Sequence, residues 1–425
     1  MPPPGATARL LRFRPVFPHV SPHFRLPGGA VARCGTGATA RTLLVLTLVV
    51  VVLATAGWTT VQTRGAPPSP RSAALAAWRE ATVAGRPLPS PDAPPATVAA
   101  FFDRLTPARQ QRLAERFPLV VGNLNGAPLT LRYQANRLAL QQARERERAR
   151  ASDTRLTEAG RHRAHRRMQR FASLSAEGRQ ILAFDPTGPG RAAEVFGDLG
   201  RAERVSVVVP GVDTELLTFE RTARAHSAPV GMARALYREQ RAAAPGRRVA
   251  VVAWADYTAP DGLTIDALTG ERAEEGGARL ASLLRSLPRR APVALFCHSY
   301  GSVVCAFAAD DAGGTVTDVV AAGSPGMRAD RAADLGPGTR VWAMRAEGDW
   351  IGDIPHLRLG ALGHGRDPMS PDFGARRLAS DGVAGHREYF RPGTTGLANM
   401  AAVGIGAYER LRCAGSDPHC ALVDT

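Results

Sequence analysis

The residues His298-Ser299-Tyr300-Gly301 lie between an apolar run at 293–297 and a second apolar run with helical character. A strand that turns sharply and leaves as a helix exposes the hydroxyl of the serine at the turn, as in a nucleophile elbow. We therefore interpret Ser299 as a nucleophile, and a serine that only caps the helix is the alternative. In the G-x-S-x-G pattern of such elbows, Cys297 stands at the first glycine, and its larger side chain predicts slight strain.

A serine hydroxyl becomes nucleophilic when a histidine takes its proton, and the histidine needs a carboxylate to orient it. In chains with this elbow the order is serine, acid, histidine. Asp349 follows a predicted strand at 340–344. We interpret Asp349 as the acid, with Asp353 and Glu347 as reserve candidates.

Three histidines follow this acid before the C-terminal tail. His386 follows a glycine in a late loop and precedes a predicted helix at 395–411, which suits the last member of the set. His356 lies too close to Asp349 in sequence to reach across as the base. His364 is assigned a structural or substrate-facing role. We therefore predict His386 as the base.

Acyl transfer also requires backbone amides that stabilise an oxyanion. The amide of Tyr300, directly after the nucleophile, is the first predicted donor. The second is expected after the apolar run 205–209, where Gly211 allows a close backbone approach and Val212 is the favoured donor. An ordinary strand-to-helix turn is the alternative.

The second half of the chain alternates short apolar runs with helical patterns, notably at 231–244, 270–286 and 302–309. This alternation is typical of a mostly parallel sheet with helix crossovers. We predict an α/β fold at 179–412, a doubly wound sheet of the α/β-hydrolase type. The predicted strands are 181–184, 205–209, 249–254, 293–297, 316–321 and 340–344.

A helical segment at 96–178 precedes this sheet. Thr106 and Pro107 form a helix start, since proline is favoured at the first helical position. A second helix is expected after Gly126-Ala127-Pro128. Alternating Arg and Glu at 141–150 predict the solvated surface of a helix.

Residues 42–63 form an uncharged stretch long enough to cross a bilayer as a helix. Six arginines at 1–41 predict a cytoplasmic N-terminus and an exported remainder, hence a single-pass membrane protein. Ala54-Thr55-Ala56 resembles a cleavage site, so a secreted protein with a removed signal peptide is the alternative. A Pro-rich linker at 64–95, with a helical run at 72–84, is expected to hold the folded part away from the membrane.

The chain of 425 residues has a formal net charge of +16. Such a charge is typical of proteins that bind nucleic acid or anionic membranes. All 54 basic residues are Arg, however, and Ala, Gly and Pro are abundant, which indicates a coding bias. Because no recognition motif accompanies the charge, we expect no nucleic-acid partner.

Cys413 and Cys420 enclose a short polar loop in the predicted C-terminal tail, 413–425. Gly and Pro in this loop could bring the two sulfurs to bonding distance, and an oxidising compartment would favour a disulfide. Two free thiols are the alternative.

The chain resembles a family of α/β-hydrolases found mainly in actinobacteria, whose substrates are not assigned. The resemblance covers about 106–406 and implies that the helical segment belongs to the same unit and covers the active site as a lid. By position it implies Ser299 as nucleophile, Asp349 as acid and His386 as base. The motifs that carry it are L-T-P-A-R, V-G-N-L-N-G-A-P, R-Y-Q-A-N-R, A-F-D-P, V-V-V-P-G-V, C-H-S-Y-G-S, A-A-G-S-P-G-M and G-H-R-E-Y-F.

These features together predict a serine hydrolase that acts on a small-molecule or lipid ester through an acyl-enzyme intermediate. No cofactor or metal is expected. An amidase or peptidase with the same three residues is the alternative among enzymes. A catalytically silent, membrane-tethered binding module is the alternative from another class.

Overall fold

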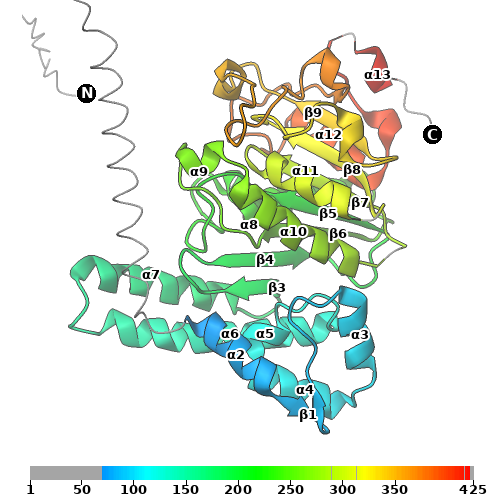
Figure 1. Cartoon of the computed structure of the whole chain (residues 1–425). Coiled ribbons are helices and arrows are strands. Elements are labelled where there is room, and N and C mark those ends of the chain that lie inside the picture. Colours follow the sequence, from blue (N-terminus) through cyan, green and yellow to red (C-terminus); the bar gives the residue numbers. More distant parts are fainter. Residues whose placement is uncertain (1–68, 289, 313, 416, 422–425) are drawn as a thin grey trace, which may run out of the picture. The chain divides into compact units, whose positions relative to one another are not determined.

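An eight-stranded sheet runs through the part of the chain that this computed structural model describes, residues 69–421 without 289, 313 and 416 (Figure 1). The strand order is β10-β9-β8-β7-β5-β6-β4-β3. β4 is antiparallel to both β3 and β6, and the other neighbours are parallel. The predicted α/β fold is confirmed. The strands are β3 Gln180–Asp185, β4 Arg191–Phe196, β5 Arg204–Val209, β6 Val249–Ala255, β7 Val293–His298, β8 Val316–Ala322, β9 Arg340–Met344 and β10 Arg376–Arg377.

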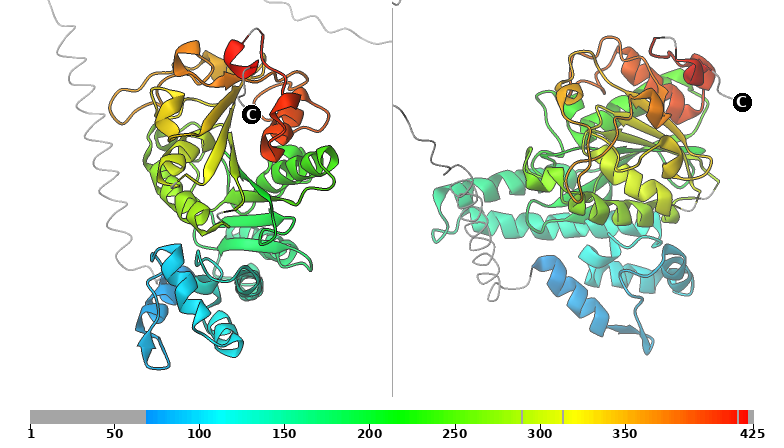
Figure 2. Two further views of the ribbon diagram at one scale, coloured as in Figure 1. Left: turned by 90° about the vertical axis from the view of Figure 1, so that its right-hand side faces the viewer. Right: turned by 45° about the horizontal axis from the view of Figure 1, so that its top comes forward.

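Two layers of helices cover the two faces of this sheet (Figure 2). α10 (Glu271–Ser286) and α11 (Gly301–Asp311) pack against one face. α8 (Pro229–Ala243) and α12 (Thr395–Ile405) pack against the other. α12 is shorter than predicted because Gly406, with φ 71°, adopts the left-handed conformation that ends helices.

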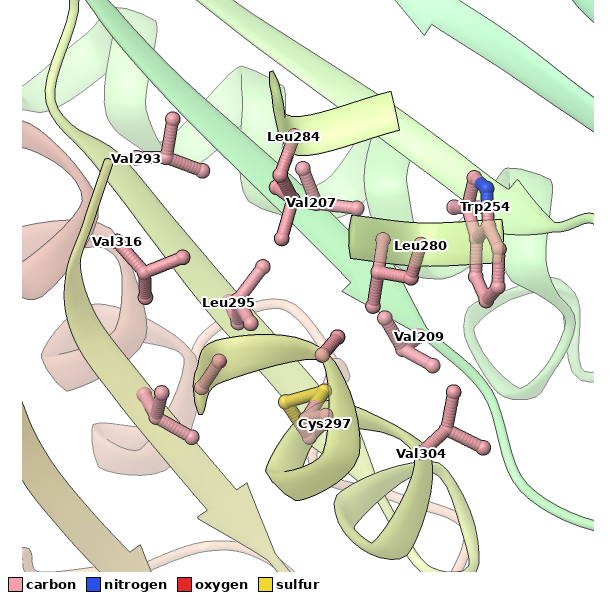
Figure 3. Packing of buried hydrophobic residues seen from close by; sticks show 14 of the residues in the cluster. Val207, Val209, Trp254, Leu280, Leu284, Val293, Leu295, Cys297, Val304 and Val316 are labelled. Carbon is pink, nitrogen blue, oxygen red and sulfur yellow. A yellow bond between two sulfur atoms is a disulfide. The ribbon is translucent and has the colours of Figure 1, made fainter. Parts of the chain in front are cut away.

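The central strands are buried on both faces because their side chains alternate between two cores. Val207 and Val209 of β5 pack with α10 and α11, as Figure 3 shows from close by, whereas Val208 packs in the opposite core. This explains the near-continuous valine runs of these strands.

Two strands of the sheet were not predicted. β4 carries Glu194, which breaks the apolar run but is buried in an ion pair with Arg179, with 2.5 Å between Oε2 and Nη2. β10 is only two residues long and consists of Arg376 and Arg377. Neither strand shows the apolar pattern on which strand prediction rests.

The helical segment packs at the β3 edge of the sheet. α4 begins at Pro107 after Thr106 and α6 begins at Leu129, both as predicted. Glu147 corrects the expectation of a fully solvated surface at 141–150, because it is buried and accepts a hydrogen bond of 2.9 Å from Nε of Arg167. The helices are α3 Pro95–Asp103, α4 Pro107–Arg116, α5 Pro118–Val121, α6 Leu129–Ala151 and α7 Glu158–Leu174.

The residues predicted as a Pro-rich linker are largely part of the folded unit. α2 (Pro70–Glu80) and the hairpin of β1 (Thr82–Val83) and β2 (Arg86–Pro87) precede α3. Trp78 of α2 is buried, and its ring meets Phe117 edge-on at 5.4 Å. The expectation of a free spacer is therefore wrong from residue 70 onward, since this aromatic packing anchors α2.

Across residues 69–421 and their three gaps, no helix is both long and apolar enough to span a bilayer. The predicted cytoplasmic segment 1–41 and the predicted span 42–63 lie outside the described residues. They stay predictions.

The C-terminal tail is packed rather than separate. Cys413 and Cys420 form a disulfide. Asp417 between them is buried and accepts hydrogen bonds from the amide and Nε of Arg377, at 2.7 and 3.2 Å. The predicted boundary at residue 413 is therefore wrong, because these contacts join the tail to strand β10.

Candidate active site

Ser299 lies at the turn between β7 and α11. Its φ of 55° falls in the left-handed region, where residues other than glycine are uncommon and strained. The Ser299 amide donates a hydrogen bond of 3.0 Å to the carbonyl of Ala322 on β8, which helps to hold this conformation. A Cβ at Gly301 would lie 2.3 Å from the carbonyl oxygen of Val209, so only glycine lets α11 begin this close to β5. The turn has the geometry expected of a nucleophile elbow.

The structure brings the three predicted reactive residues together. Nε2 of His386 lies 2.9 Å from Oγ of Ser299. Nδ1 of His386 lies 2.9 and 3.1 Å from the two carboxylate oxygens of Asp349. With the proton on Nδ1 shared with the carboxylate, Nε2 is free to accept the proton of the serine hydroxyl.

Asp349 is buried in a cage of hydrogen-bond donors. Besides His386, it accepts bonds from the hydroxyl of Tyr389, at 2.6 Å, and from the amide of Ile351, at 3.0 Å. Burial alone raises the pKa of Asp349, but the bonds from these three donors outweigh it and leave the pKa below its usual value. Asp349 is therefore an ionised acceptor at neutral pH.

Among the described residues, no hydrogen bond joins the other candidates to this set, although His364 lines the same pocket. Asp353 and Glu347, the reserve acids, are exposed. Nε2 of His364 donates a bond of 2.7 Å to the carbonyl of Ala267, and Nε2 of His356 lies 3.8 Å from Asp367.

The part of the chain that the structure describes holds no group of three or more His, Cys, Asp or Glu arranged to bind a metal.

Three residues around the site were missed by the sequence analysis. Tyr389 also accepts a bond of 2.9 Å from the amide of Ala346, which fixes its hydroxyl against Asp349. Nε2 of His298 donates to the carbonyl of His386 at 2.5 Å, and burial lowers the pKa of His298 to about 3. A Cβ at Gly323 would lie 2.7 Å from Oδ2 of Asp349. All three lie in motifs that carry the resemblance, His298 in C-H-S-Y-G-S, Gly323 in A-A-G-S-P-G-M and Tyr389 in G-H-R-E-Y-F, but the motifs alone assign them no role.

The predicted oxyanion donors lie beside the nucleophile. A Cβ at Gly211 would lie 2.7 Å from Cβ of Ser299, so the backbone of this loop passes directly over the serine. Gly211, Val212 and Tyr300 all line one pocket with Ser299. Within the described residues, the amides of Val212 and Tyr300 donate no backbone hydrogen bond. Both amides are thus available to an oxygen bound above Ser299.

A disulfide joins the two elements that flank Ser299. Cys297 at the end of β7 is bonded to Cys305 of α11, and both are buried in the core (Figure 3). The sequence leaves these two cysteines unpaired in the prediction, and Cys297, as an oversized residue, is predicted to strain the elbow. The sulfur of Cys297 is instead bonded to Cys305 within the hydrophobic core on the α10 and α11 side of the sheet.

The site opens into a cavity of about 560 Å³, within the usual size of small-molecule pockets. Its walls include Val212, Met232, Leu268, Trp350 and Ile354. None of its described lining residues comes from 96–178. The expectation that this segment covers the site as a lid is wrong, because α6 and α7 pack at the β3 edge instead.

Comparison with known proteins agrees with this fold. A family model described as alpha/beta hydrolase matches residues 185–359. An uncharacterized protein of Mycobacterium bovis is 32% identical over 197 residues, which cover 44% of this chain and 72% of that protein. An uncharacterized protein of Mycobacterium tuberculosis is 28% identical over 385 residues, covering 77% of this chain. The chain spans 58% of the length of that second relative.

Two solved structures are also similar to this chain. One is an α/β serine hydrolase without lid from Xanthomonas campestris, at 13% identity and a TM-score of 0.31, covering 56% of this chain and 98% of that one. The other is the esterase LipW from Mycobacterium marinum, at 13% identity and a TM-score of 0.29, covering 72% and 96%. The match to the family model and the 32% identical relative together show that the chain belongs to the alpha/beta hydrolase family. Its relatives include uncharacterized mycobacterial proteins, whose substrates are unassigned.

Proposed function

We propose that this protein is a serine hydrolase that cleaves carboxylic esters through an acyl-enzyme intermediate. The observation that carries the proposal is the pair of contacts made by His386. Its Nε2 is 2.9 Å from Oγ of Ser299, and its Nδ1 is 2.9 Å from Oδ1 of Asp349. This is the arrangement in which a serine, a general base and an orienting acid act as a unit.

A residue of the site can carry out each step of ester hydrolysis. His386 takes the proton of Ser299 as the serine oxygen bonds to the carbonyl carbon of the ester. The amides of Val212 and Tyr300 donate to the resulting oxyanion. When the tetrahedral intermediate collapses, His386 protonates the departing alcohol and the acyl group stays on Ser299. A water molecule, deprotonated by His386, then releases the acid.

The extracytoplasmic location is part of the same proposal. It is supported by the arginine-rich residues before the uncharged stretch at 42–63. The two disulfides, Cys297–Cys305 and Cys413–Cys420, also support it, because disulfides persist mainly in oxidising compartments.

The test is a matched substrate panel. Purified protein is assayed with p-nitrophenyl butyrate and with the corresponding p-nitroanilide, beside the Ser299→Ala variant. We expect ester hydrolysis that the variant loses. Faster cleavage of the anilide would favour the amidase alternative. Equal rates with the variant would contradict a serine mechanism. The catalytically silent alternative is disfavoured by the short contact between His386 and Ser299.

A further inference from the structure

The exposed large hydrophobic side chains of the described residues gather in two stretches of the chain. These are 263–268, which contains the short helix α9 (Ile265–Leu268), and 350–362. Leu359 is 77% exposed and Ile265 is 70% exposed. The members of this set, here called the apolar rim, are Leu263, Ile265, Leu268, Trp350, Leu357, Leu359 and Leu362.

Although far apart in sequence, the two stretches are joined in space. Thr269 forms a β-bridge with Leu362, and the amide of Gly363 donates a bond of 2.8 Å to the carbonyl of Leu268. His364, which is buried, donates from Nε2 to the carbonyl of Ala267 at 2.7 Å. The apolar rim is therefore a single structured surface built on two linked loops.

The apolar rim is continuous with the pocket of Ser299. Leu263, Leu268 and Trp350 belong to the rim and also line the pocket. The ring of Trp350 lies 4.8 Å from that of His386, so the rim reaches the predicted base itself. A molecule that covers the rim thus lies at the entrance to the reactive serine.

We propose that the apolar rim binds the surface of aggregated lipid and delivers an acyl chain from it into the pocket of Ser299. Contiguous exposed apolar surface marks a site of interaction with a membrane or a partner. A second copy of this chain seated on the rim would close the pocket, whereas a lipid surface supplies the ester that the pocket takes. Only the delivery step rests on the proposed ester hydrolysis.

The charges at the pocket mouth fit an anionic lipid surface. Arg221 and Arg387 line the pocket and are exposed. Asp213, an acidic residue of the same wall, accepts a bond of 2.7 Å from the amide of Gly262, so the two arginines outnumber the one carboxylate among the lining residues. Arginine pairs well with the phosphate of a lipid headgroup. We therefore expect the apolar rim to enter the acyl region while these arginines meet the headgroups.

The test separates binding from chemistry. Ser299→Ala protein is sedimented with vesicles of phosphatidylcholine and phosphatidylglycerol, so that binding is measured without turnover. The double variant Ile265→Ser/Leu359→Ser on this background removes two rim side chains that do not line the pocket. The double variant Ile265→Leu/Leu359→Ile is the matched control that keeps the rim apolar. We expect the polar pair to weaken vesicle binding about tenfold or more, and the control pair to bind like the parent.

Activity gives a second measurement. With Ser299 intact, the polar pair should lower the rate on a long-chain ester presented in vesicles about fivefold or more relative to the rate on soluble p-nitrophenyl acetate. Circular dichroism checks that the variants are folded, which we expect because both side chains lie in solvent.

Several results would overturn the proposal. These results are a parent protein that leaves vesicles unbound, a polar pair that binds as the parent does, and a dimer in sedimentation velocity that the polar pair dissociates. Failure of ester hydrolysis alone leaves vesicle binding by the Ser299→Ala protein measurable, so the two proposals fail separately.

Discussion

The reaction centre and the apolar rim are built in opposite ways. Ser299 and Asp349 are 6% and 5% exposed, lie at or just beyond the ends of parallel strands, and have their polar atoms bonded. The apolar rim lies on two connecting segments, which include the short helix α9, and its side chains are 40–77% exposed. The contrast suggests a division of work, in which rigid strand ends hold the chemistry and exposed loops select the substrate. Substitutions in the two regions should therefore have different kinetic signatures.

The largest effect is expected at the acid of the reaction centre. Asp349→Asn keeps the shape of the side chain but removes the charge that orients His386. We expect kcat to fall about 10⁴-fold, on short and long esters alike, because the histidine then favours the wrong tautomer. Steady-state rates on both esters give the measurement. Asp353→Asn, at an exposed neighbour, is the control, and a larger loss there would move the acid to Asp353.

A smaller loss is expected at the residue that positions this acid. Tyr389→Phe removes the hydroxyl that donates to Asp349 at 2.6 Å and leaves the ring in the core. We expect kcat to fall about 10- to 100-fold with little change in KM, since a hydrogen bond to a charged group is lost. Without this donor the pKa of Asp349 should rise. On the acid side of the pH–rate profile, the activity of the variant should therefore fall at a higher pH than the activity of the parent. A rise in KM with kcat intact would make Tyr389 a substrate contact instead.

The reaction centre should also show a pH-dependent stability. The pKa of His298 is lowered to about 3, mainly by burial and to a smaller extent by the nearby His386. Between about pH 6.5 and 3 the unfolded chain therefore binds a proton at this residue that the folded chain does not, and stability falls as the pH falls. The lowered pKa of Asp349 stabilises the folded protein above its usual pKa of 3.8, and this stabilisation is lost as the pH falls further, so Asp349 adds little to the change between pH 7.0 and 4.5.

Urea unfolding at pH 7.0 and 4.5 measures this difference. From pH 7.0 to 4.5 we expect the parent to lose on the order of 2 kcal/mol more than His298→Asn does. His162→Asn, at an exposed position on α7, should lose as much as the parent. An equal loss in His298→Asn and the parent would mean that His298 takes up its proton in the folded protein.

The smallest effect is expected where the two regions meet. Trp350 lies against His386 and is also 40% exposed in the apolar rim. Trp350→Ala should raise KM for a long-chain ester about threefold to tenfold, and KM for an acetate by less. Leu357→Ala, in the rim but outside the pocket lining, is the comparison variant. A fall in kcat that exceeds the rise in KM would place Trp350 with the reaction centre.

Sequence reasoning succeeded where the signal was local or followed from chain order. Ser299 could be predicted because strand, turn and helix are contiguous around it. Asp349 and His386 could be predicted because parallel strands bring successive loops to one edge of the sheet. The structure places all three within hydrogen-bond reach, and their catalytic roles stay predictions until activity is measured.

Other features depend on contacts that sequence patterns do not encode. Strand β4 was not predicted because Glu194 interrupts its apolar pattern, and the buried ion pair of Glu194 with Arg179 forms only in the folded protein. Tyr389 reaches Asp349 from a tight turn around His386, in which the amide of Glu388 is bonded to the carbonyl of Gly385. The pairing of Cys297 with Cys305 could have been inferred, since an elbow brings the end of its strand beside the following helix. The prediction that 96–178 covers the active site was wrong because the resemblance indicates the order of segments along the chain and not how they pack.

Labelling with a fluorophosphonate probe tests the central claim most directly. The folded protein is incubated with the probe, digested and analysed by mass spectrometry, beside Ser299→Ala and the control Ser302→Ala. We predict a single phosphonylated residue, Ser299, with labelling abolished in Ser299→Ala and retained in Ser302→Ala. An unmodified Ser299 in folded protein, or equal labelling of the Ser299→Ala variant, would contradict the account.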